Sequence, residues 1–381
     1  MMMRKTLVTL LVVTFVLGIA SMASAATFTD TEGEDYEDAA SVLSALGVLY
    51  GYTDGTFRGE DEITRAEFAA VVVRALGLDS AANYAMGASQ FSDVKAGAWY
   101  TGYINVAANE GIVNGYPDGT FKPTNNVTYA EAVTMLVRAL GFEPAVKGAY
   151  PTGYLVKAAD LGVTDDVSFD ATDNATRGDV AIMVDNSLTI EMMEQVGYGA
   201  DATWEVPEEG ADTFLSKLGL EEVEGWVDGN EFTNSNLDSD EITIDGKTYV
   251  VEVEGVDIPS LLGEEVKVWV DGDDIMALSR ETDAEDIMYD TVDGDSTSKE
   301  VNLLVEDEDF DWADDATVYL NNEAVDVDEL PDGSYGKFVL DEDGDVLYAN
   351  VFDFETVGVV TKVDGDEITY RDASNANEDE V

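Results

Sequence analysis

The chain has 381 residues, with no cysteine, no histidine and a formal net charge of −62 at pH 7. The absence of cysteine excludes disulfide bonds and thiol chemistry, and the absence of histidine removes the commonest general base and metal ligand. Residues 201–381 contain 55 acidic and 8 basic residues, so this part carries −47 of the charge. Because such a surface repels nucleic acid and anionic lipid headgroups, we expect neither as a partner.

The charge also predicts sensitivity to ions. At about 1 M ionic strength the Debye length falls to roughly 3 Å, which weakens repulsion between carboxylates. Divalent cations bound by paired carboxylates would have the same effect. A saline habitat or a calcium requirement therefore stands beside simple solubility as the reason for the charge, and calcium is the one cofactor that the composition suggests.

Residues 1–25 have the pattern of a secretory signal peptide. Arg4 and Lys5 precede an apolar run from Leu7 to Ile19, and Ala23-Ser24-Ala25 matches a cleavage site. The run is too short for a comfortable membrane span, and no later stretch reaches about 18 uninterrupted apolar residues. We predict a secreted protein without a membrane span after cleavage.

A repeated pattern occupies residues 28 to about 190. Gly51, Thr64, Arg74 and Gly77 return 64 residues later as the same residue types, and a third, degenerate copy follows. A fixed period predicts one supersecondary unit used repeatedly. The predicted repeats are residues 26–85, 86–145 and 146–195.

The pattern within each repeat predicts a short helix, then a loop with a turn, then a longer helix. Every long helix begins at a capping residue and carries an apolar stripe, which predicts that the three long helices pack as a central bundle. The predicted caps are Thr64 with Glu67, Thr128 with Glu131, and Thr176 with Asp179.

The repeats contain Phe91-Ser-Asp-Val94, Trp99-Tyr100, the loop from Gly115 to Pro123, and Ile63-Thr-Arg-Ala-Glu67. With these motifs the repeats resemble the S-layer homology module. The resemblance implies a pseudo-threefold unit whose grooves hold a secondary cell-wall polysaccharide, in many bacteria one with pyruvate ketals, or another polymer linked to peptidoglycan.

The first position of each long helix is the main candidate for ligand contact. Arg65 and Arg177 add positive charge where the helix dipole is already positive, so each needs an anion. A neighbouring carboxylate would make the arginine structural, whereas a guanidinium acting with free helix amides would bind a ligand carboxylate. Tyr129 takes this position in the second repeat and cannot make a bidentate pair. The third repeat lacks the Gly-Tyr-x-Asp-Gly-Thr loop, so its groove is the least defined.

Aromatic residues are the other candidates for glycan contact. Tyr36, Trp99 and Tyr150 lie at the front of the three repeats, and Tyr52 and Tyr116 lie in the turns. Flat rings with polar tips suit sugar faces and helix packing equally, so both alternatives stay open. No catalytic residue is predicted.

The pattern changes after the repeats, which predicts an α+β multidomain fold with mainly helical repeats followed by all-β modules. The β part is predicted from short alternating segments and Asp-Gly turns. We predict a linker with one short helix at 196–222, β-modules at 223–290 and 291–371, and a polar tail at 372–381. Strands from Val357 either complete an earlier module or belong to a shortened form of a longer protein. Asp341–Asp345 is read as a hairpin turn, with calcium binding as the alternative.

Three classes of function fit these patterns. The leading one is a structural protein of the S-layer type that is anchored to the wall by its repeats, with an acidic β-rich region for lattice contacts and self-assembly. The alternatives are an anchored exoenzyme, such as a glycosidase with two carboxylates, and an anchored adhesin.

Overall fold

The computed structural model describes most of the chain beyond the predicted signal peptide, which lies outside the described residues. The described ranges are 28–196, 203–208, 210–253, 256–282, 286–294, 296–304, 308–341, 343–353, 358–364, 367–372 and 379–380. Within them, none of the helices has the length and apolar character needed to cross a bilayer.

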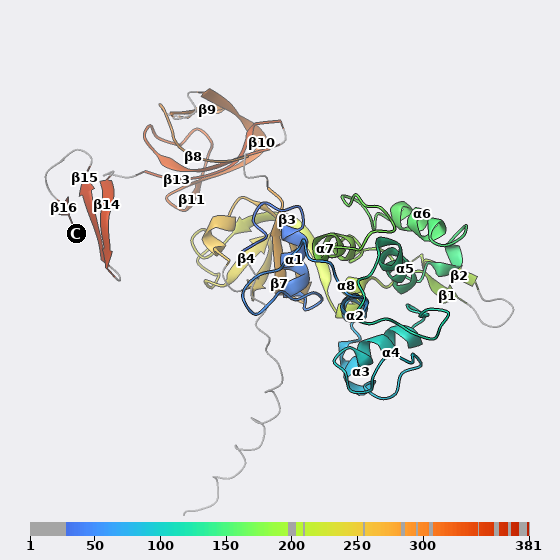
Figure 1. Ribbon diagram of the computed structural model, residues 1–381. Coiled ribbons are helices and arrows are strands. Elements are labelled where there is room, and N and C mark those ends of the chain that lie inside the picture. Colours follow the sequence, from blue (N-terminus) through green and yellow to red (C-terminus); the bar gives the residue numbers. More distant parts are fainter. Residues whose placement is uncertain are drawn as a thin grey trace, which may run out of the picture. The chain divides into compact units, whose positions relative to one another are not determined.

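The first half of the described chain is helical, as the sequence predicts (Figure 1). Three helices begin directly after Thr64, Thr128 and Thr176, and these are the predicted long helices α2, α5 and α7. The helices of this region are α1 (Glu37–Ala45), α2 (Arg65–Ala75), α3 (Asp79–Tyr84), α4 (Thr101–Asn109), α5 (Tyr129–Ala139), η1 (Glu143–Ala145), α6 (Thr152–Asp160) and α7 (Arg177–Asp185). The predicted short helices correspond to α1, α4 and α6.

A closed ring of backbone hydrogen bonds joins the three predicted repeats just before the long helices. The amide of Ile63 donates to the carbonyl of Ala175 at 3.1 Å, that of Ala175 to Val127 at 2.8 Å, and that of Val127 to Ile63 at 3.0 Å. All three residues are fully buried. Each repeat therefore donates to one of the other two and accepts from the other.

The helical core extends into the segment predicted as a linker, which is a correction to the sequence prediction. Helix α8 (Phe214–Leu218) buries Phe214 and Leu215 in the same apolar cluster as the repeats. Gly77, which ends α2, lies so close to α8 that a Cβ there would be 2.3 Å from the carbonyl oxygen of Lys217. Residues 210–220 are thus part of the helical body, because their apolar side chains complete its core.

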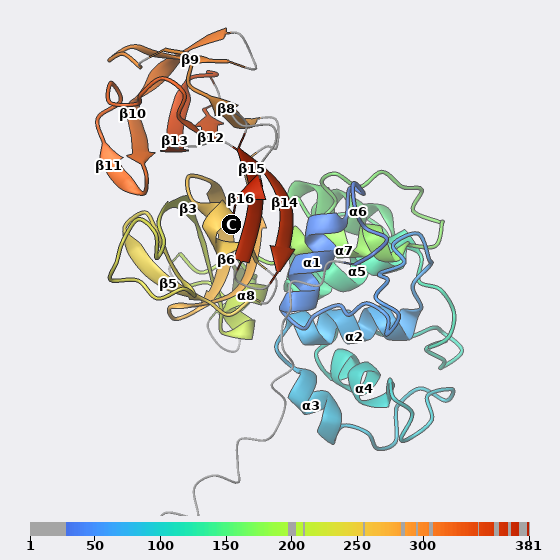
Figure 2. The same cartoon turned by 90° about the vertical axis from the view of Figure 1, so that its left-hand side faces the viewer.

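Strands dominate the second half of the described chain (Figure 2). A hairpin of β1 (Glu194–Val196) and β2 (Thr203–Glu205) comes first. The later strands are β3 (Glu221–Gly229), β4 (Glu241–Ile244), β5 (Lys247–Val251), β6 (Glu265–Asp271), β7 (Asp274–Arg280), β8 (Ile287–Thr291), β9 (Glu300–Leu303), β10 (Glu308–Leu320), β11 (Glu323–Val325), β12 (Tyr335–Leu340), β13 (Val346–Phe352), β14 (Gly358–Asp364), β15 (Glu367–Asp372) and β16 (Asp379–Glu380), with a 3-10 helix η3 at Ile258–Leu261.

These strands form three further assemblies. A closed barrel has the order β3–β4–β5–β7–β6, and a six-stranded sheet has the order β11–β10–β13–β12–β8 with β9 paired to β10. A separate three-stranded sheet has the order β14–β15–β16. In the six-stranded sheet β10 and β13 are parallel, whereas β12 is antiparallel to both β13 and β8.

Two predicted boundaries of the β part are wrong. The boundary at residue 290 cuts through β8, which pairs with β12 in the six-stranded sheet. The boundary at 371 separates β16 from β15, with which it pairs, and the strands that follow Val357 form their own sheet. The first point depends on pairing between strands distant in sequence, which local alternation does not reveal. The second depends on pairing between the consecutive strands β15 and β16.

The chain divides into two compact units. The first contains the described residues up to Val223 together with Val251–Val256 and Val268–Ser279. The second contains Glu224–Val250, Asp257–Lys267 and the described residues from Arg280 onward.

Candidate functional site

The start of each long helix is capped by its own repeat and by a neighbouring repeat. The hydroxyls of Thr64, Thr128 and Thr176 accept from the amides of Glu67, Glu131 and Asp179, so the predicted caps are present. The amides at the first helical positions donate across repeats, from Arg65 to Asn125 at 2.8 Å, from Tyr129 to Asp173 at 3.0 Å and from Arg177 to Asp61 at 2.9 Å. These amides already have partners, so the predicted receptor made of free helix amides and a guanidinium does not exist in this form.

Each first-position side chain also crosses into another repeat. Arg177, from the third repeat, lies against the loop of the first repeat, where Nε donates to the carbonyl of Phe57 at 3.0 Å and Nη2 to that of Tyr50 at 2.9 Å. Its guanidinium carbon lies 5.0 Å from the ring centroids of Tyr52 and Phe57. Arg177 is only 5% exposed, and burial lowers the pKa of its guanidinium.

A pocket of about 210 Å³ opens beside Arg177, and we call it the first groove. Its walls combine cations, one carboxylate and aromatic rings. They are formed by Leu49, Tyr50, Gly51, Tyr52, Glu67, Ala70, Val71, Arg74, Trp99 and Arg177. Trp99 is 54% exposed, so much of its ring is free for contact with a ligand.

Arg74 is the second cation of the first groove. Its guanidinium carbon lies 5.1 Å from the ring centroid of Tyr50 and 4.9 Å from that of Tyr103, and Nε is 3.4 Å from a carboxylate oxygen of Asp79. The Tyr103 hydroxyl donates to the same carboxylate at 2.6 Å. Arg74 is thus held in place by two rings and one carboxylate.

The second repeat forms an equivalent group of residues around Arg65, which comes from the first repeat. Arg65 Nε donates to the carbonyl of Phe121 at 2.9 Å, and Nη1 lies 3.0 Å from a carboxylate oxygen of Glu131. The Tyr116 hydroxyl donates to the other oxygen of Glu131 at 2.6 Å. Burial, followed by this bond, raises the pKa of Tyr116 to about 12. We call this group the second groove because its residues correspond to those around Arg177 in the first; its arginine has a carboxylate partner within the protein.

Tyr129 makes the corresponding contact with the third repeat. Its ring stacks on Phe169 with the centroids 4.7 Å apart, and its hydroxyl donates to Asp179. Burial and this hydrogen bond raise the pKa of Tyr129 to about 12. At 5% exposure Tyr129 has little surface for a sugar, so here the structure favours packing over ligand contact.

The predicted aromatic candidates separate into exposed and buried residues. Trp99 and Tyr150 are 54% and 58% exposed, and both are available to a ligand. Tyr36 is 7% exposed and stacks on Phe57, so the structure does not bring it to a groove. Tyr52 lies at the first groove beneath the guanidinium of Arg58, whose carbon is 4.0 Å from the ring centroid.

Sequence reasoning missed Arg74 and its counterpart Arg138. Arg138 lies beside Tyr154 and pairs with Glu143 at 2.8 Å, as Arg74 lies beside Tyr103 and pairs with Asp79. The signal was present, because the two arginines are separated by the 64-residue period. The sequence could not predict that Arg65 and Arg177 reach into neighbouring repeats, because the spacing of the repeats does not say which of them are in contact.

The acidic loops of the second unit show turn chemistry. In the predicted turn Asp341–Asp345, one carboxylate oxygen of Asp341 accepts from the amides of Asp343 and Asp345 at 3.0 and 2.9 Å. Among the described residues, no three acidic side chains are grouped so that they could hold a metal ion. The loop connects the antiparallel strands β12 and β13, as the hairpin prediction expects.

Comparison with known proteins supports a place at the bacterial cell surface. The family model of the S-layer homology domain matches residues 27–69 and 90–133, which lie in the first two repeats. The middle cell wall protein of Brevibacillus brevis is 32% identical over 99% of this chain, and the surface layer protein of Brevibacillus choshinensis is 37% identical over 64%. The cell surface protein of Thermoanaerobacter kivui is 35% identical over 48%.

The chain spans only part of these relatives, namely 42%, 23% and 24% of their respective lengths. The domain match and the names of the relatives together indicate a secreted, cell-surface protein with S-layer homology repeats.

Proposed function

We propose that this chain anchors a structural protein of the S-layer type, without covalent linkage, to a cell-wall polysaccharide. The observation that carries the proposal is the first groove, where Arg177 of the third repeat meets the aromatic rings and Arg74 of the first. Because Trp99 of the second repeat also lines the groove, the site is assembled from all three repeats and requires the folded set, which fits an anchoring unit better than a flexible tether.

The three repeats form a pseudo-threefold unit in this proposal. The ring through Ile63, Val127 and Ala175 supports it, because each member makes the same contact with the next. The first-position residues of the long helices make equivalent contacts in the opposite sense around the ring, each reaching into the next repeat. The grooves are therefore related by the same rotation, and their differences arise from side chains.

The ligand that suits the first groove is an anionic sugar. Aromatic rings with polar tips bind pyranose faces, and an arginine binds a carboxylate with charge-assisted hydrogen bonds. The pocket is smaller than the roughly 300 Å³ at which typical small-molecule sites begin, so it would admit one sugar or its substituent rather than a long segment. A pyruvate ketal presents a carboxylate of this kind.

The first groove should contribute more to binding than the second. In the second groove Glu131 already neutralises Arg65 at 3.0 Å and accepts from Tyr116. A ligand carboxylate there would have to displace or approach Glu131, which costs electrostatic energy. The first groove also contains a carboxylate, that of Glu67, but Arg177 donates to two neutral carbonyls, so its charge is less neutralised than that of Arg65.

We assign the acidic β-rich part to contacts at the cell surface, including lattice contacts between copies and calcium bound between their carboxylates. The exoenzyme and adhesin alternatives remain distinguishable by experiment. Ordered assembly of the purified chain in calcium would support the structural role. Sugar release from a panel of polysaccharides would support an enzyme, and partner binding without self-assembly would support an adhesin.

The anchoring proposal is tested by co-sedimentation of the full chain with purified wall sacculi, with and without their secondary polysaccharide. We expect Trp99→Ala and Arg74→Gln each to weaken binding roughly 10- to 100-fold, the loss expected for one stacking or charge-assisted contact. Sacculi stripped of the polysaccharide should not bind the parent protein.

Tyr84→Ala is the matched control, because Tyr84 is an aromatic residue of the same unit that is 92% exposed and is not part of the groove. It should bind like the parent. Thermal melts of all variants verify equal foldedness. Parent-like binding by the Trp99 and Arg74 variants would show that the groove is not the site.

A further inference from the structure

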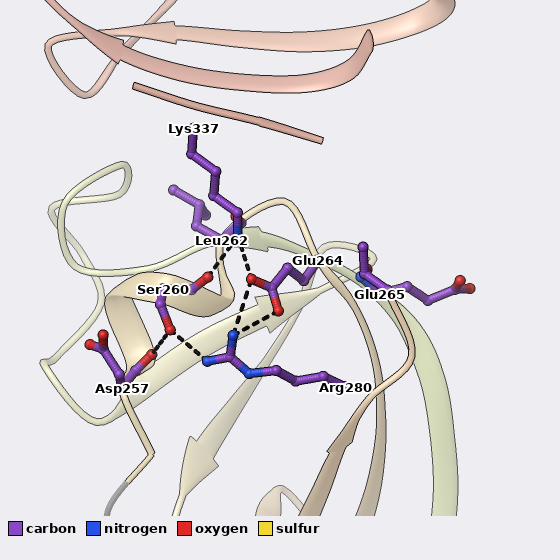
Figure 3. A network of polar contacts seen from close by, with 8 residues as sticks. Asp257, Ser260, Leu262, Glu264, Glu265, Arg280 and Lys337 are labelled. Carbon is purple, nitrogen blue, oxygen red and sulfur yellow. Dashed lines mark hydrogen bonds and ion pairs between the residues drawn. The ribbon is translucent and has the colours of Figure 1, made fainter. Parts of the chain in front are cut away.

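The second unit contains a buried ion pair that connects two of its separate segments. Lys337 lies on β12 of the six-stranded sheet, and its side chain ends against the segment from η3 to the start of β6 (Figure 3). Its ammonium contacts the Glu264 carboxylate and donates to the carbonyls of Ser260 at 2.8 Å and Leu262 at 3.2 Å. Three acceptors thus surround one ammonium.

Glu264 is held from its other side by Arg280. Nη1 of Arg280 lies 3.0 and 3.2 Å from the two carboxylate oxygens, and Nη2 donates to the Ser260 hydroxyl at 2.5 Å. The Glu264 side chain is 1% exposed and that of Lys337 is 9% exposed, whereas that of Arg280 is 42% exposed. Arg280 therefore fixes the carboxylate from the solvent side, and Lys337 meets it from the sheet.

Close packing surrounds this ion pair on the same face of the sheet. Tyr348 of β13 lies opposite Val339 of β12, two residues from Lys337, so both side chains point to one face. Gly263, with φ of 78°, approaches Tyr348 so closely that a Cβ would be 2.1 Å from its ring. Tyr319 of β10 adds a hydrogen bond of 3.4 Å to the carbonyl of Asp228.

A contact of this kind sets orientation more than it adds stability. Burying two charges costs several kcal/mol each, and their attraction repays this cost only when the geometry is good and the remaining donors are satisfied. Burial lowers the pKa of Lys337, while the bond to Glu264 acts in the opposite direction. A small displacement of the sheet would leave a buried charge without its partner, so few orientations are acceptable.

We propose that the Glu264–Lys337 ion pair fixes the six-stranded sheet in one orientation against Asp257–Lys267, so that this part of the second unit behaves as a stiff body. Apolar contact alone would tolerate sliding, since it has no direction. Stiffness would give the copies of a surface array a constant geometry. The proposal does not depend on the glycan-binding function, because none of its residues belongs to the first unit.

The absence of cysteine allows a direct test in the full chain. Asp240→Cys and Glu323→Cys place spin labels at two exposed positions, one on the Asp238–Asp240 turn before β4 and one on β11. The parent with these labels should give one narrow distance distribution, and adding Lys337→Met should broaden it. Hydrogen exchange at the amides of Gly263 and Glu264 should accelerate about ten-fold or more, because local opening becomes easier.

Lys267→Met is the matched control, because it removes the same charge from an ion pair with Glu281 whose side chains are 29% and 31% exposed. It should leave the distribution and the exchange rates unchanged. Glu264→Gln preserves the shape and should also broaden the distribution, so it decides the question if Lys337→Met prevents folding. Narrow, parent-like distributions in both the Lys337 and the Glu264 variants would overturn the proposal.

Discussion

Arg65 and Arg177 occupy the same position in their helices but meet different surroundings. Arg65 pairs with a carboxylate of the protein, Glu131, whereas Arg177 donates to the carbonyls of Phe57 and Tyr50. The helix dipole argument predicted an anion for each arginine; Arg65 has one in Glu131, and for Arg177 the anion stays a prediction. It could not indicate which arginine would find a carboxylate, because Glu131 belongs to the next repeat.

The cross-repeat tyrosines make the first unit sensitive to alkali. Tyr116 and Tyr129 have pKa values raised to about 12, by burial first and then by hydrogen bonds to Glu131 and Asp179. Between pH 10 and 12 the unfolded chain loses these protons while the folded chain keeps them. The contribution of the two tyrosines to the free energy of unfolding should therefore be fully present below pH 10 and should be lost as the pH rises toward 12.

Ultraviolet absorbance of the phenolates, followed against pH, measures this directly. The parent should show tyrosines that ionise near pH 12, and Tyr116→Phe and Tyr129→Phe should each remove one of them. A titration in which every tyrosine ionises near pH 10 while the protein stays folded would contradict the expectation.

At the scale of elements, local signals were sufficient for the helices of the repeats and insufficient for the sheets. The Thr–Glu capping pairs at Thr64 and Thr128 set where α2 and α5 begin, and these starts agree with the structure. Strand β8 was assigned to the wrong module because its partner, β12, follows about 50 residues later and no turn connects them. Helix α8 was read as part of a linker because two buried apolar residues are a weak pattern.

The role of α8 leads to a stability prediction. Phe214 is fully buried in the core of the first unit, so Phe214→Ala should lower the free energy of unfolding of that unit by about 3–5 kcal/mol through lost burial and a cavity. Denaturant unfolding followed by circular dichroism at the helical signal gives the measurement.

Trp204→Ala is the matched control in the same region, because Trp204 is an aromatic residue that is 48% exposed. It should change the free energy of unfolding by less than about 1 kcal/mol. An equally small effect of Phe214→Ala would mean that α8 is not integral to the helical body, as the linker reading held.

For the whole molecule, the dominant physical feature is the uneven charge. Residues 201–381 carry a net charge of −47, with only 8 basic residues to balance the acidic ones. Four of these basic residues form ion pairs in the described part of the chain, namely Lys217, Lys267, Arg280 and Lys337. The remaining carboxylates repel one another in the compact state, and the repulsion is weaker in salt.

Sodium chloride should therefore raise the melting temperature of the β-rich part of the full chain, most steeply up to about 1 M, where the Debye length reaches roughly 3 Å. The buried Glu264–Lys337 ion pair should not weaken over this range, because solvent ions do not reach it. Melts followed by near-ultraviolet circular dichroism in a sodium series provide the measurement, and a flat series would leave the charge as a device for solubility.

Calcium at the same ionic strength separates screening from binding. Among the described residues no acidic group is arranged to hold a metal, so we expect dilute protein to melt at the same temperature in both salts. Carboxylates from different copies would meet only when the copies associate. Calcium should therefore raise the melting temperature more than sodium does, and the difference should grow as the protein concentration rises. Wall binding through the repeats should persist in chelator. A melting temperature that is higher in calcium than in sodium at every protein concentration would instead indicate a calcium site within one chain.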